Sequence, residues 1–411
     1  MKNILFLGTL LFCIVSCSKE KQISLTNNAG FARTDEPVVI QRNFLDSIFR
    51  KDISGLFPLI RTRQGDTIPS QTDDLNGDGK WDELFLLADF KPFEKKEILI
   101  SLIDPSHKPK FTDRAHIRFA KTIEINKKYE AIDKAVRLKS TASELSLAAF
   151  QMEGPAWESD KIAFRNYFDA RNGIDIYGKI TSRMVLDSVG TGEDYHNILW
   201  WGMDILHVGT SLGAGGIGML AGDTLYRLDL PESGGFEAVS RGPLRVILRL
   251  TYKNWQVKDK KLNVIHEIST WGGFYGYQSK ITVSGSEKNS TLVCGIVNIH
   301  SDTLYVRNSN PSFTVMFTHD KQAFLGEYLG LGLLLPNSNF TGHSNAGKTG
   351  AGIIQTYLAQ LNTLPDKPVT FRFYAGWEKT NADFGNATLF GKFLETEAER
   401  LSKPILLKVE N

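Results

Sequence analysis

Hydrophobic and polar side chains alternate along much of the second half of the chain. The run 245–252 puts Val, Leu, Leu and Tyr on one face and Arg, Ile, Arg and Thr on the other. The run 261–270 places Leu262, Val264 and Ile268 on a common face. Sustained period-two patterning predicts antiparallel strands with one face covered.

Further strands are expected at 278–284, 292–300, 312–319 and 369–377, with the best helical pattern at 395–401. A repeat of about 20–50 residues is not evident, which argues against a propeller or a solenoid. The fold class is therefore predicted to be mainly β. Residues 146–411 are expected to form a large antiparallel β-sandwich, a supersandwich of the mutarotase-like kind, carrying the catalytic site.

A second, smaller unit is expected before the sandwich. Short apolar runs separated by polar breaks predict a small β-domain over residues 37–125. Residues 17–36 are polar and are interpreted as a tether, and the charged segment 126–145 as a linker. A length of 411 residues fits two domains.

The first sixteen residues resemble a bacterial lipoprotein signal peptide. A basic start precedes about a dozen apolar residues, too few to span a bilayer, and a small residue comes directly before Cys17. Cys17 is therefore the expected lipidation site, and a plain secretory signal is the alternative. Either interpretation predicts export; the first predicts a lipoprotein of the cell envelope whose only membrane contact is its lipid anchor. Of the three cysteines only Cys294 lies outside this segment, in an apolar run, which excludes a disulfide framework and indicates a buried thiol.

Charge and composition limit the classes of partner that the protein is expected to bind. The chain has 48 Lys and Arg against 46 Asp and Glu, so its formal net charge of +2 gives no indication of nucleic-acid binding. The segment 342–349 ends in Gly-Lys-Thr, but it lacks the strand–helix context of a phosphate loop, and an exported protein meets no ATP. We therefore expect neither nucleotide nor organic cofactor. Aromatic residues reach 11%, which suits both a large core and a sugar-binding cleft.

One loop has the oxygen spacing of a calcium site. Asp74, Asn76, Asp78 and Asp82 occupy relative positions 1, 3, 5 and 9, and Lys80 at position 7 would offer its main-chain carbonyl. Position 12 lacks the glutamate of an EF-hand and lies in an expected strand, so the predicted role of the Ca²⁺ is structural. The alternative is a metal-free turn rich in Asp, Asn and Gly.

The segment 150–216 mixes polar, aromatic and glycine residues without periodicity, as loops that carry function do. Its Glu-Gly-Pro-Ala-Trp-Glu-Ser-Asp-Lys run at 153–161 is followed by Phe-Arg-Asn-Tyr-Phe-Asp at 164–169. Further on come Trp-Gly-Met-Asp at 201–204, Leu-Gly-Ala-Gly-Gly at 212–216 and Tyr-Ala-Gly-Trp-Glu at 374–378.

Together with the calcium-like loop, these motifs resemble a bacterial domain-of-unknown-function family of exported lipoproteins found with polysaccharide-degrading enzymes. The resemblance covers most of the chain after residue 35. Part of that family is similar to oligosaccharide dehydratases of ulvan breakdown, which remove water from a terminal glucuronate. The resemblance therefore implies a carbon–oxygen lyase acting on an acidic oligosaccharide.

Such an elimination needs a base, an acid for the leaving hydroxyl and a cation for the carboxylate. Residues of suitable chemistry are His196 and Tyr195 as acid and base, Arg165 as the carboxylate clamp with Lys161 in reserve, and His266 as either a cleft or a core residue. The candidate sugar platforms are Trp157, Trp201, Tyr275 and Trp377.

Three other functions stay open on the sequence. They are a polysaccharide lyase, a glycoside hydrolase using paired carboxylates such as Glu153, Glu158 or Asp169, and a non-catalytic glycan-binding lipoprotein.

Overall fold

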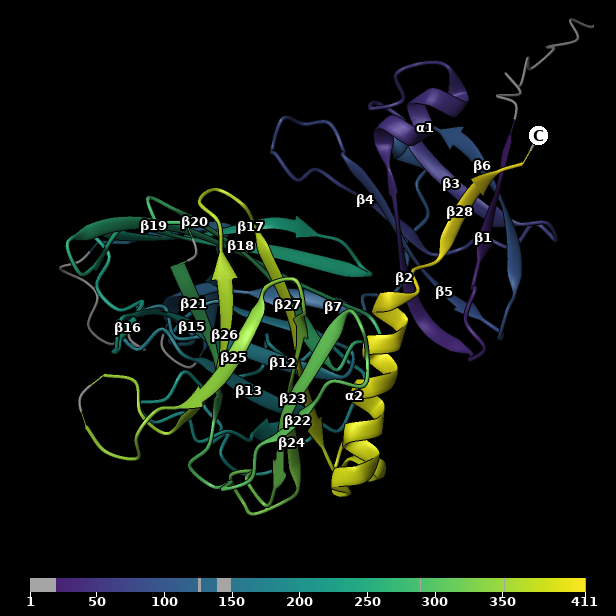
Figure 1. The fold of residues 1–411 in the computed structure, drawn as a ribbon. Coiled ribbons are helices and arrows are strands. Elements are labelled where there is room, and N and C mark those ends of the chain that lie inside the picture. The colour runs from purple at the N-terminus through teal and green to yellow at the C-terminus, as the bar shows by residue number, and fades with distance from the viewer. Residues whose placement is uncertain (1–19, 125–126, 139–148, 289, 351, 411) are drawn as a thin grey trace, which may run out of the picture.

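The computed structural model describes residues 20–124, 127–138, 149–288, 290–350 and 352–410 (Figure 1). Cys17 and the expected signal peptide lie outside these residues. Within these ranges strands dominate and helices are few, and the strands pair in antiparallel fashion, with one isolated parallel bridge between Ile174 and Gly213. The helical segments are α1 (Arg42–Phe49), α2 (Ala387–Ser402) and the 3-10 turns η1 (Pro105–His107) and η3 (Ala382–Gly385). Within the described residues no helix has the length and apolar character needed to cross a membrane.

A small domain forms around two sheets that pack with α1. The four-stranded sheet has the order β28 (Leu406–Val409), β1 (Lys21–Thr26), β6 (Lys95–Ile103), β3 (Phe57–Thr62). The three-stranded sheet has the order β2 (Arg33–Gln41), β5 (Glu83–Phe90), β4 (Ser70–Asp73). Ile23, Ile40, Leu84 and Ile98 are among its buried core residues.

The limits of this domain differ from the predicted ones. Residues 21–26, expected in a tether, form β1, because Ile23 and Leu25 are fully buried between β6 and β28. The last strand of the chain returns to pair with β1, and Figure 1 shows β28 inside the small domain. In a sequence, short strands with few apolar residues resemble a polar linker. Only their pairing with distant strands shows that they belong to a sheet.

The large domain is a sandwich. One layer is a nine-stranded sheet, in the order β10 (Lys134–Leu138), β17 (Ser233–Arg241), β18 (Arg245–Val257), β19 (Lys260–Trp271), β20 (Gly276–Ser284), β27 (Val369–Trp377), β24 (Leu329–Pro336), β23 (Phe313–Asp320), β22 (Tyr305–Arg307).

The opposite layer consists of two five-stranded sheets. The first has the order β14 (Gly202–Asp204), β13 (Ile174–Lys179), β12 (Ile162–Asn166), β11 (Ala156–Ser159), β7 (Ala115–Arg118). The second has the order β16 (Thr224–Arg227), β15 (Ala214–Ala221), β21 (Ser290–Val297), β26 (Thr356–Thr363), β25 (Phe340–Asn345). A separate hairpin joins β8 (Ala120–Glu124) to β9 (Lys128–Ala131).

Aromatic side chains join the two layers of the sandwich. The ring centroid of Trp157 on β11 lies 5.2 Å from that of Tyr277 on β20, and that of Phe164 on β12 lies 6.1 Å from that of Phe373 on β27. All four belong to one buried cluster that reaches both layers. The predicted fold class, mainly β with a large antiparallel sandwich, is confirmed.

The predicted domain boundary and linker lie elsewhere. β7, expected in the small domain, pairs with β11 of the sandwich. In the expected linker 126–145, β9 pairs with β8, and β10 forms an edge of the nine-stranded sheet by pairing with β17. Residues 139–145 lie outside the described residues. The charged side chains that suggested a linker belong to edge positions of sheets, where one side of each strand faces solvent.

Helix α2 covers the outer face of the nine-stranded sheet and leads the chain back to the small domain (Figure 1). Asn386 caps it by accepting the backbone N–H groups of the first turn. Its buried Phe390 and Leu394 lie over Gly330 and Gly332 of β24, where a Cβ atom would come within 2.4 Å and 2.6 Å of these side chains. Glycine in β24 therefore allows the close approach of helix and sheet.

A buried ion pair fixes the small domain to the sandwich. Arg245 of β18 places its Nε 2.9 Å from Asp73 Oδ2 and its Nη2 2.8 Å from Glu83 Oε2, and its guanidinium lies over the ring of Phe85. Gln71 donates to the carbonyl of the same arginine over 2.9 Å. Losing either side of such a pair leaves a buried charge uncompensated, so the pair contributes to holding the two domains together.

Candidate active site

Polar residues collect on the outer face of the sheet β14-β13-β12-β11-β7. Because side chains alternate along a strand, Phe164 and Ile176 enter the sandwich core while Arg165 and Asp175 point to the other face. Arg165 and Asp175 are register partners, so their side chains meet directly. The order of residues in two adjacent strands thus places a charged pair outside the core.

Arg165 is the centre of this group. Its Nη2 lies 2.6 Å from Asp175 Oδ2, and its Nη1 lies 3.4 Å from Glu153 Oε2. The Tyr167 hydroxyl lies 2.9 Å from both Arg165 Nη2 and Asp175 Oδ2. Arg165 is only 2% exposed, so protein carboxylates occupy its guanidinium. Arg165 was predicted to bind a substrate carboxylate; in the structure its Nη atoms contact the carboxylates of Asp175 and Glu153.

Protonation in this group follows from burial. Burial, and then repulsion from Asp175, raise the pKa of Asp204 well above its ordinary range. Burial and the neighbouring charge therefore favour the neutral, protonated form of Asp204. Burial likewise raises the pKa of Tyr167 and of Tyr195, although the charge of Arg165 opposes the rise for both. Both phenols are protonated at neutral pH.

A row of aromatic and imidazole rings runs outward from this group. Ring centroids are 4.7 Å apart between Tyr195 and His196, 5.1 Å between His196 and Phe324, and 4.4 Å between Phe324 and His207. Beyond them His207 Nδ1 lies 3.1 Å from His300 Nε2. His196, His207 and His300 are exposed, whereas Tyr195 and Phe324 are half-buried.

The histidines of this row differ in their surroundings. Burial, then the nearby His300 and His196, lower the pKa of His207. His207 is therefore neutral at neutral pH and can accept a proton. His196 Nδ1 lies 3.1 Å from Asp194 Oδ1. A neutral imidazole, His207, and a protonated phenol, Tyr195, thus belong to one row of rings, with His196 and Phe324 between them. Such groups can serve as a general base and a general acid.

The loop 180–201 covers the rest of this sheet face. Glu158 and Lys179, both fully buried, form an ion pair of 2.6 Å. Glu158 also accepts the backbone N–H groups of Val185 and Leu186, over 2.8 Å and 3.0 Å. The pair therefore anchors the loop that carries Tyr195. The sequence offered Glu158 as a carboxylate of a glycoside hydrolase. In the structure its side chain is buried, and its oxygens contact Lys179 and the backbone of the loop.

The structure brings Arg165, Tyr195 and His196 together and separates the other candidates. His266 is 2% exposed and lies between core residues of β19, and its Nε2 lies 2.8 Å from Ser279 Oγ. Of the two alternatives for His266, the structure therefore supports the core residue. Lys161 and Tyr275 lie in a cavity between the domains.

Three of the four proposed platforms are fully buried: Trp157, Trp201 and Trp377. Their indoles fill cores in which no sugar can stack on them. Tyr275, the fourth, lines a cavity between the domains. Bulky aromatics in an irregular segment are as useful for packing loops as for binding, and the sequence does not distinguish the two uses.

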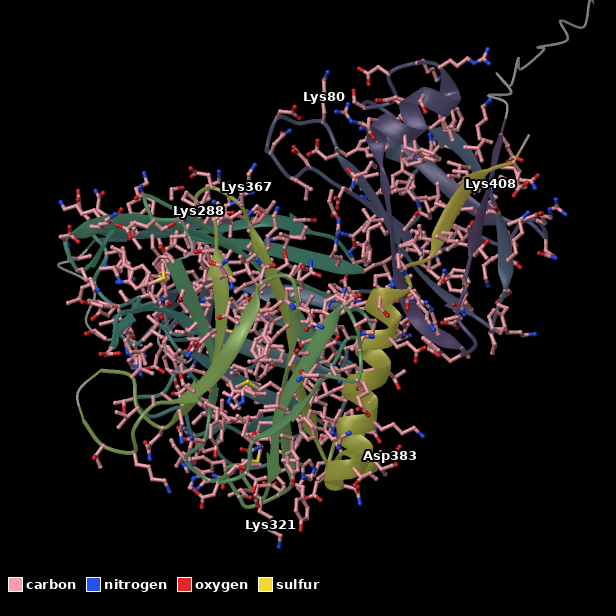
Figure 2. All side chains as sticks on the ribbon, in the orientation of Figure 1. Lys80, Lys288, Lys321, Lys367, Asp383 and Lys408 are labelled. Carbon is pink, nitrogen blue, oxygen red and sulfur yellow. The ribbon has the colours of Figure 1, made fainter. Side chains whose placement is uncertain are left out.

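The calcium-like loop forms a turn closed by its own side chains. Asp74 accepts the N–H groups of Gly77 and Gly79, and Asp82 accepts that of Leu75. Figure 2 shows Lys80 pointing away from the loop, as expected. Among the described residues no three His, Cys, Asp or Glu side chains converge as metal ligands. Calcium at this loop stays a prediction.

Several residues of the site lacked an individual signal in the sequence. The sequence analysis gave no role to three residues of the segment 150–216: Asp175, Asp204 and Tyr167. His207 and His300 are 93 positions apart and meet only in the fold. Alternation within 174–179 could have identified Asp175, because a charged residue between two isoleucines marks a polar position beside a core strand.

The architecture and the site define a two-domain β-sandwich protein with an acid–base surface beside a buried carboxylate cluster. The chain belongs to the family described as a domain of unknown function, DUF4861, whose profile matches residues 25–407. The predicted membership of a family of unknown function is thereby confirmed.

A curated relative, an uncharacterized protein P7 from Formosa agariphila, is 23% identical over 274 residues, covering 62% of this chain and 66% of the relative. Two solved structures from Enterococcus faecalis show fold likeness: an α-mannosidase (TM-score 0.48, 9% identity) and a protein in glycosyl hydrolase family 38 (TM-score 0.48, 8% identity). Each comparison covers 96% of this chain, but 46% and 48% of the solved chains. At these TM-scores the likenesses carry no functional weight.

Proposed function

We propose that the protein is an exported carbohydrate-active enzyme that eliminates water from the terminal uronate of an acidic oligosaccharide of the ulvan type. The observation that supports it is the row of rings that joins the neutral His207, paired with His300, to the protonated Tyr195. Elimination at neutral pH needs such a base and such an acid together.

The steps can be assigned to this surface. His207 takes the proton from C5, alpha to the carboxylate; the electrons of the C5–H bond form the C4–C5 double bond, and the C4–O bond breaks. Tyr195 gives its proton to the leaving hydroxyl, which departs as water. The proton on His207 then returns to the tyrosinate through solvent, which restores both groups.

The arrangement favours elimination over hydrolysis. A glycosidase needs two carboxyl groups free to act on the bond. Here Asp175 is committed to Arg165, Glu153 contacts Arg165 and Arg171, and Asp169 is bound by Arg171. The cations of this cluster are likewise occupied, which leaves the exposed His196 and His300 to face the substrate carboxylate.

The test is incubation with uronate oligosaccharides, following ultraviolet absorbance of the unsaturated product and its mass. A dehydratase yields absorbance and loses one water without shortening the chain, whereas a lyase shortens the chain. Shortening without absorbance, or no reaction at all, would contradict the proposal.

Site variants assign the roles. Tyr195→Phe and His207→Ala should each lower turnover by on the order of 10²–10⁴-fold, typical for loss of a general acid or base. Tyr226→Phe and the exposed His343→Ala are matched controls outside the site and should retain turnover. If both site variants kept turnover while the parent enzyme eliminated water, the function would stand and the site would be wrong.

A further inference from the structure

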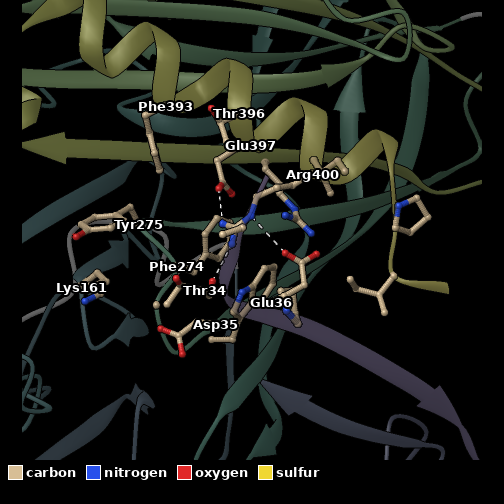
Figure 3. Close-up of a pocket in the computed structure, with 18 residues that line it drawn as sticks. Thr34, Asp35, Glu36, Lys161, Phe274, Tyr275, Phe393, Thr396, Glu397 and Arg400 are labelled. Carbon is tan, nitrogen blue, oxygen red and sulfur yellow. Dashed lines mark hydrogen bonds and ion pairs between the residues drawn. The ribbon is translucent and has the colours of Figure 1, made fainter. Parts of the chain in front are cut away.

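A cavity of about 520 Å³ lies at the junction of the two domains and helix α2. In Figure 3, Phe393, Glu397 and Arg400 approach it from α2, Asp35 and Glu36 from β2, and Tyr275 and Lys161 from the sandwich. Its size is in the range of small-molecule sites, which are about 300–1,000 Å³.

The carboxylates of this cavity already have cationic partners. Glu36 lies 2.8 Å from Arg33 and 3.3 Å from Arg400, which also lies 2.7 Å from Glu397. Asp35 is held by Arg114 over 2.9 Å. The negative charge of the lining is therefore neutralised before any ligand enters.

Two cations in the same lining have no carboxylate partner among the described residues: Lys161 and Arg372. Lys161 Nζ lies 5.8 Å from the ring centroid of Tyr275. The Arg372 guanidinium lies 4.9 Å from the ring of Trp271 and 5.5 Å from that of Phe274. Its polar partners are neutral: Nε lies 3.3 Å from the Gln278 amide oxygen, and the side chain also interacts with the Tyr374 hydroxyl. Half-buried cations without a carboxylate partner at a cavity are receptors for an anion.

The remaining lining suits a sugar. Tyr275 and Phe393 provide half-buried rings for the apolar face of a pyranose, and Thr34 and Thr396 provide hydroxyls. We propose that this cavity binds a pyranose unit bearing one anionic group, a carboxylate or a sulfate, contacted by Lys161 and Arg372.

This binding site is separate from the acid–base surface. Lys161 precedes β12 and Arg165 lies near its far end, four residues on, which is roughly 13 Å at about 3.3 Å per strand residue. The binding site does not depend on the proposed elimination. It would hold a part of an acidic glycan against both domains at once.

The experiment is isothermal titration of the full chain with D-glucuronate, glucose 6-sulfate and neutral glucose. At least one anionic sugar should bind at least tenfold more tightly than glucose, and the preferred one identifies the anion. Lys161→Gln and Arg372→Gln should each weaken that binding by roughly 10-fold or more, as expected for a lost charged hydrogen bond. Arg372→Lys should restore part of it. The exposed Lys392→Gln on α2 is the matched control and should retain affinity.

Equal affinity for glucose, no binding of either anionic sugar, or unchanged affinity in Lys161→Gln and Arg372→Gln would overturn the proposal. Repeating the titrations in His207→Ala separates the two sites. Retained binding there supports a distinct cavity, and lost binding would place the sugar at the acid–base surface and overturn it. Absence of elimination activity leaves these binding results unaffected.

Discussion

Acid should destabilise the protein through His266. Its imidazole is buried in the sandwich core, and burial lowers its pKa to about 3, from an ordinary value of about 6.5. Between these values the unfolded chain binds a proton that the folded protein does not. His266 therefore leaves stability unaffected above the unfolded pKa, and stability is lost as the pH falls from about 6.5 towards about 3.

The magnitude follows from the shift. One pKa unit corresponds to about 1.4 kcal/mol, so the full effect approaches roughly 5 kcal/mol near pH 3. Between about pH 7.5 and about pH 5 the expected loss is roughly 2 kcal/mol, because only the interval below pH 6.5 contributes. Other groups also titrate in this range, so the effect must be measured against a variant that lacks the imidazole.

The assay is urea unfolding of the wild type and of His266→Gln at about pH 7.5 and about pH 5. Glutamine cannot titrate there and can retain a hydrogen bond to Ser279. The wild type should lose roughly 2 kcal/mol more than the variant. His343→Gln, which replaces an exposed histidine of β25, should behave as the wild type. Equal losses in wild type and His266→Gln would refute a buried, neutral His266.

Four further predictions concern the anchor, the site, the loop and export. Glu158→Gln should lower the free energy of unfolding by roughly 3–5 kcal/mol in urea titrations, because Lys179 would stay buried without its partner; an unchanged midpoint would contradict the anchor role. Since the pKa of His207 is lowered, kcat/KM should fall with acid only below about pH 6.5, and a profile that falls already above that pH would argue against His207 as the base. If the 74–82 loop binds calcium, a chelator should lower the melting temperature and Asp78→Ala should remove the response; a chelator-insensitive melt with no metal by elemental analysis favours the plain turn. Cys17→Ala should release the protein from the membrane fraction, and unchanged association and processing would reject lipidation.

The sequence by itself determined the β architecture, because alternation with period two is a local property that any antiparallel strand with one covered face must show. It also indicated the segment 150–216, a stretch without periodicity that contains Arg165, Tyr195 and His196 of the candidate site. Local pattern could not determine the domain limits. β1 pairs with β28 across nearly the whole chain, and short, polar edge strands resemble linkers until their partners are known.

The roles of individual residues were decided only by the tertiary structure. Arg165 looked like a ligand for substrate, but the register of β12 and β13 sets Asp175 beside it and occupies its guanidinium. His207 and His300 carry no shared motif, yet the fold brings them to 3.1 Å. Residue type and spacing show which chemical groups a segment contains. Which partner satisfies a charge, and which side chain faces water, depends on contacts between positions far apart in the chain.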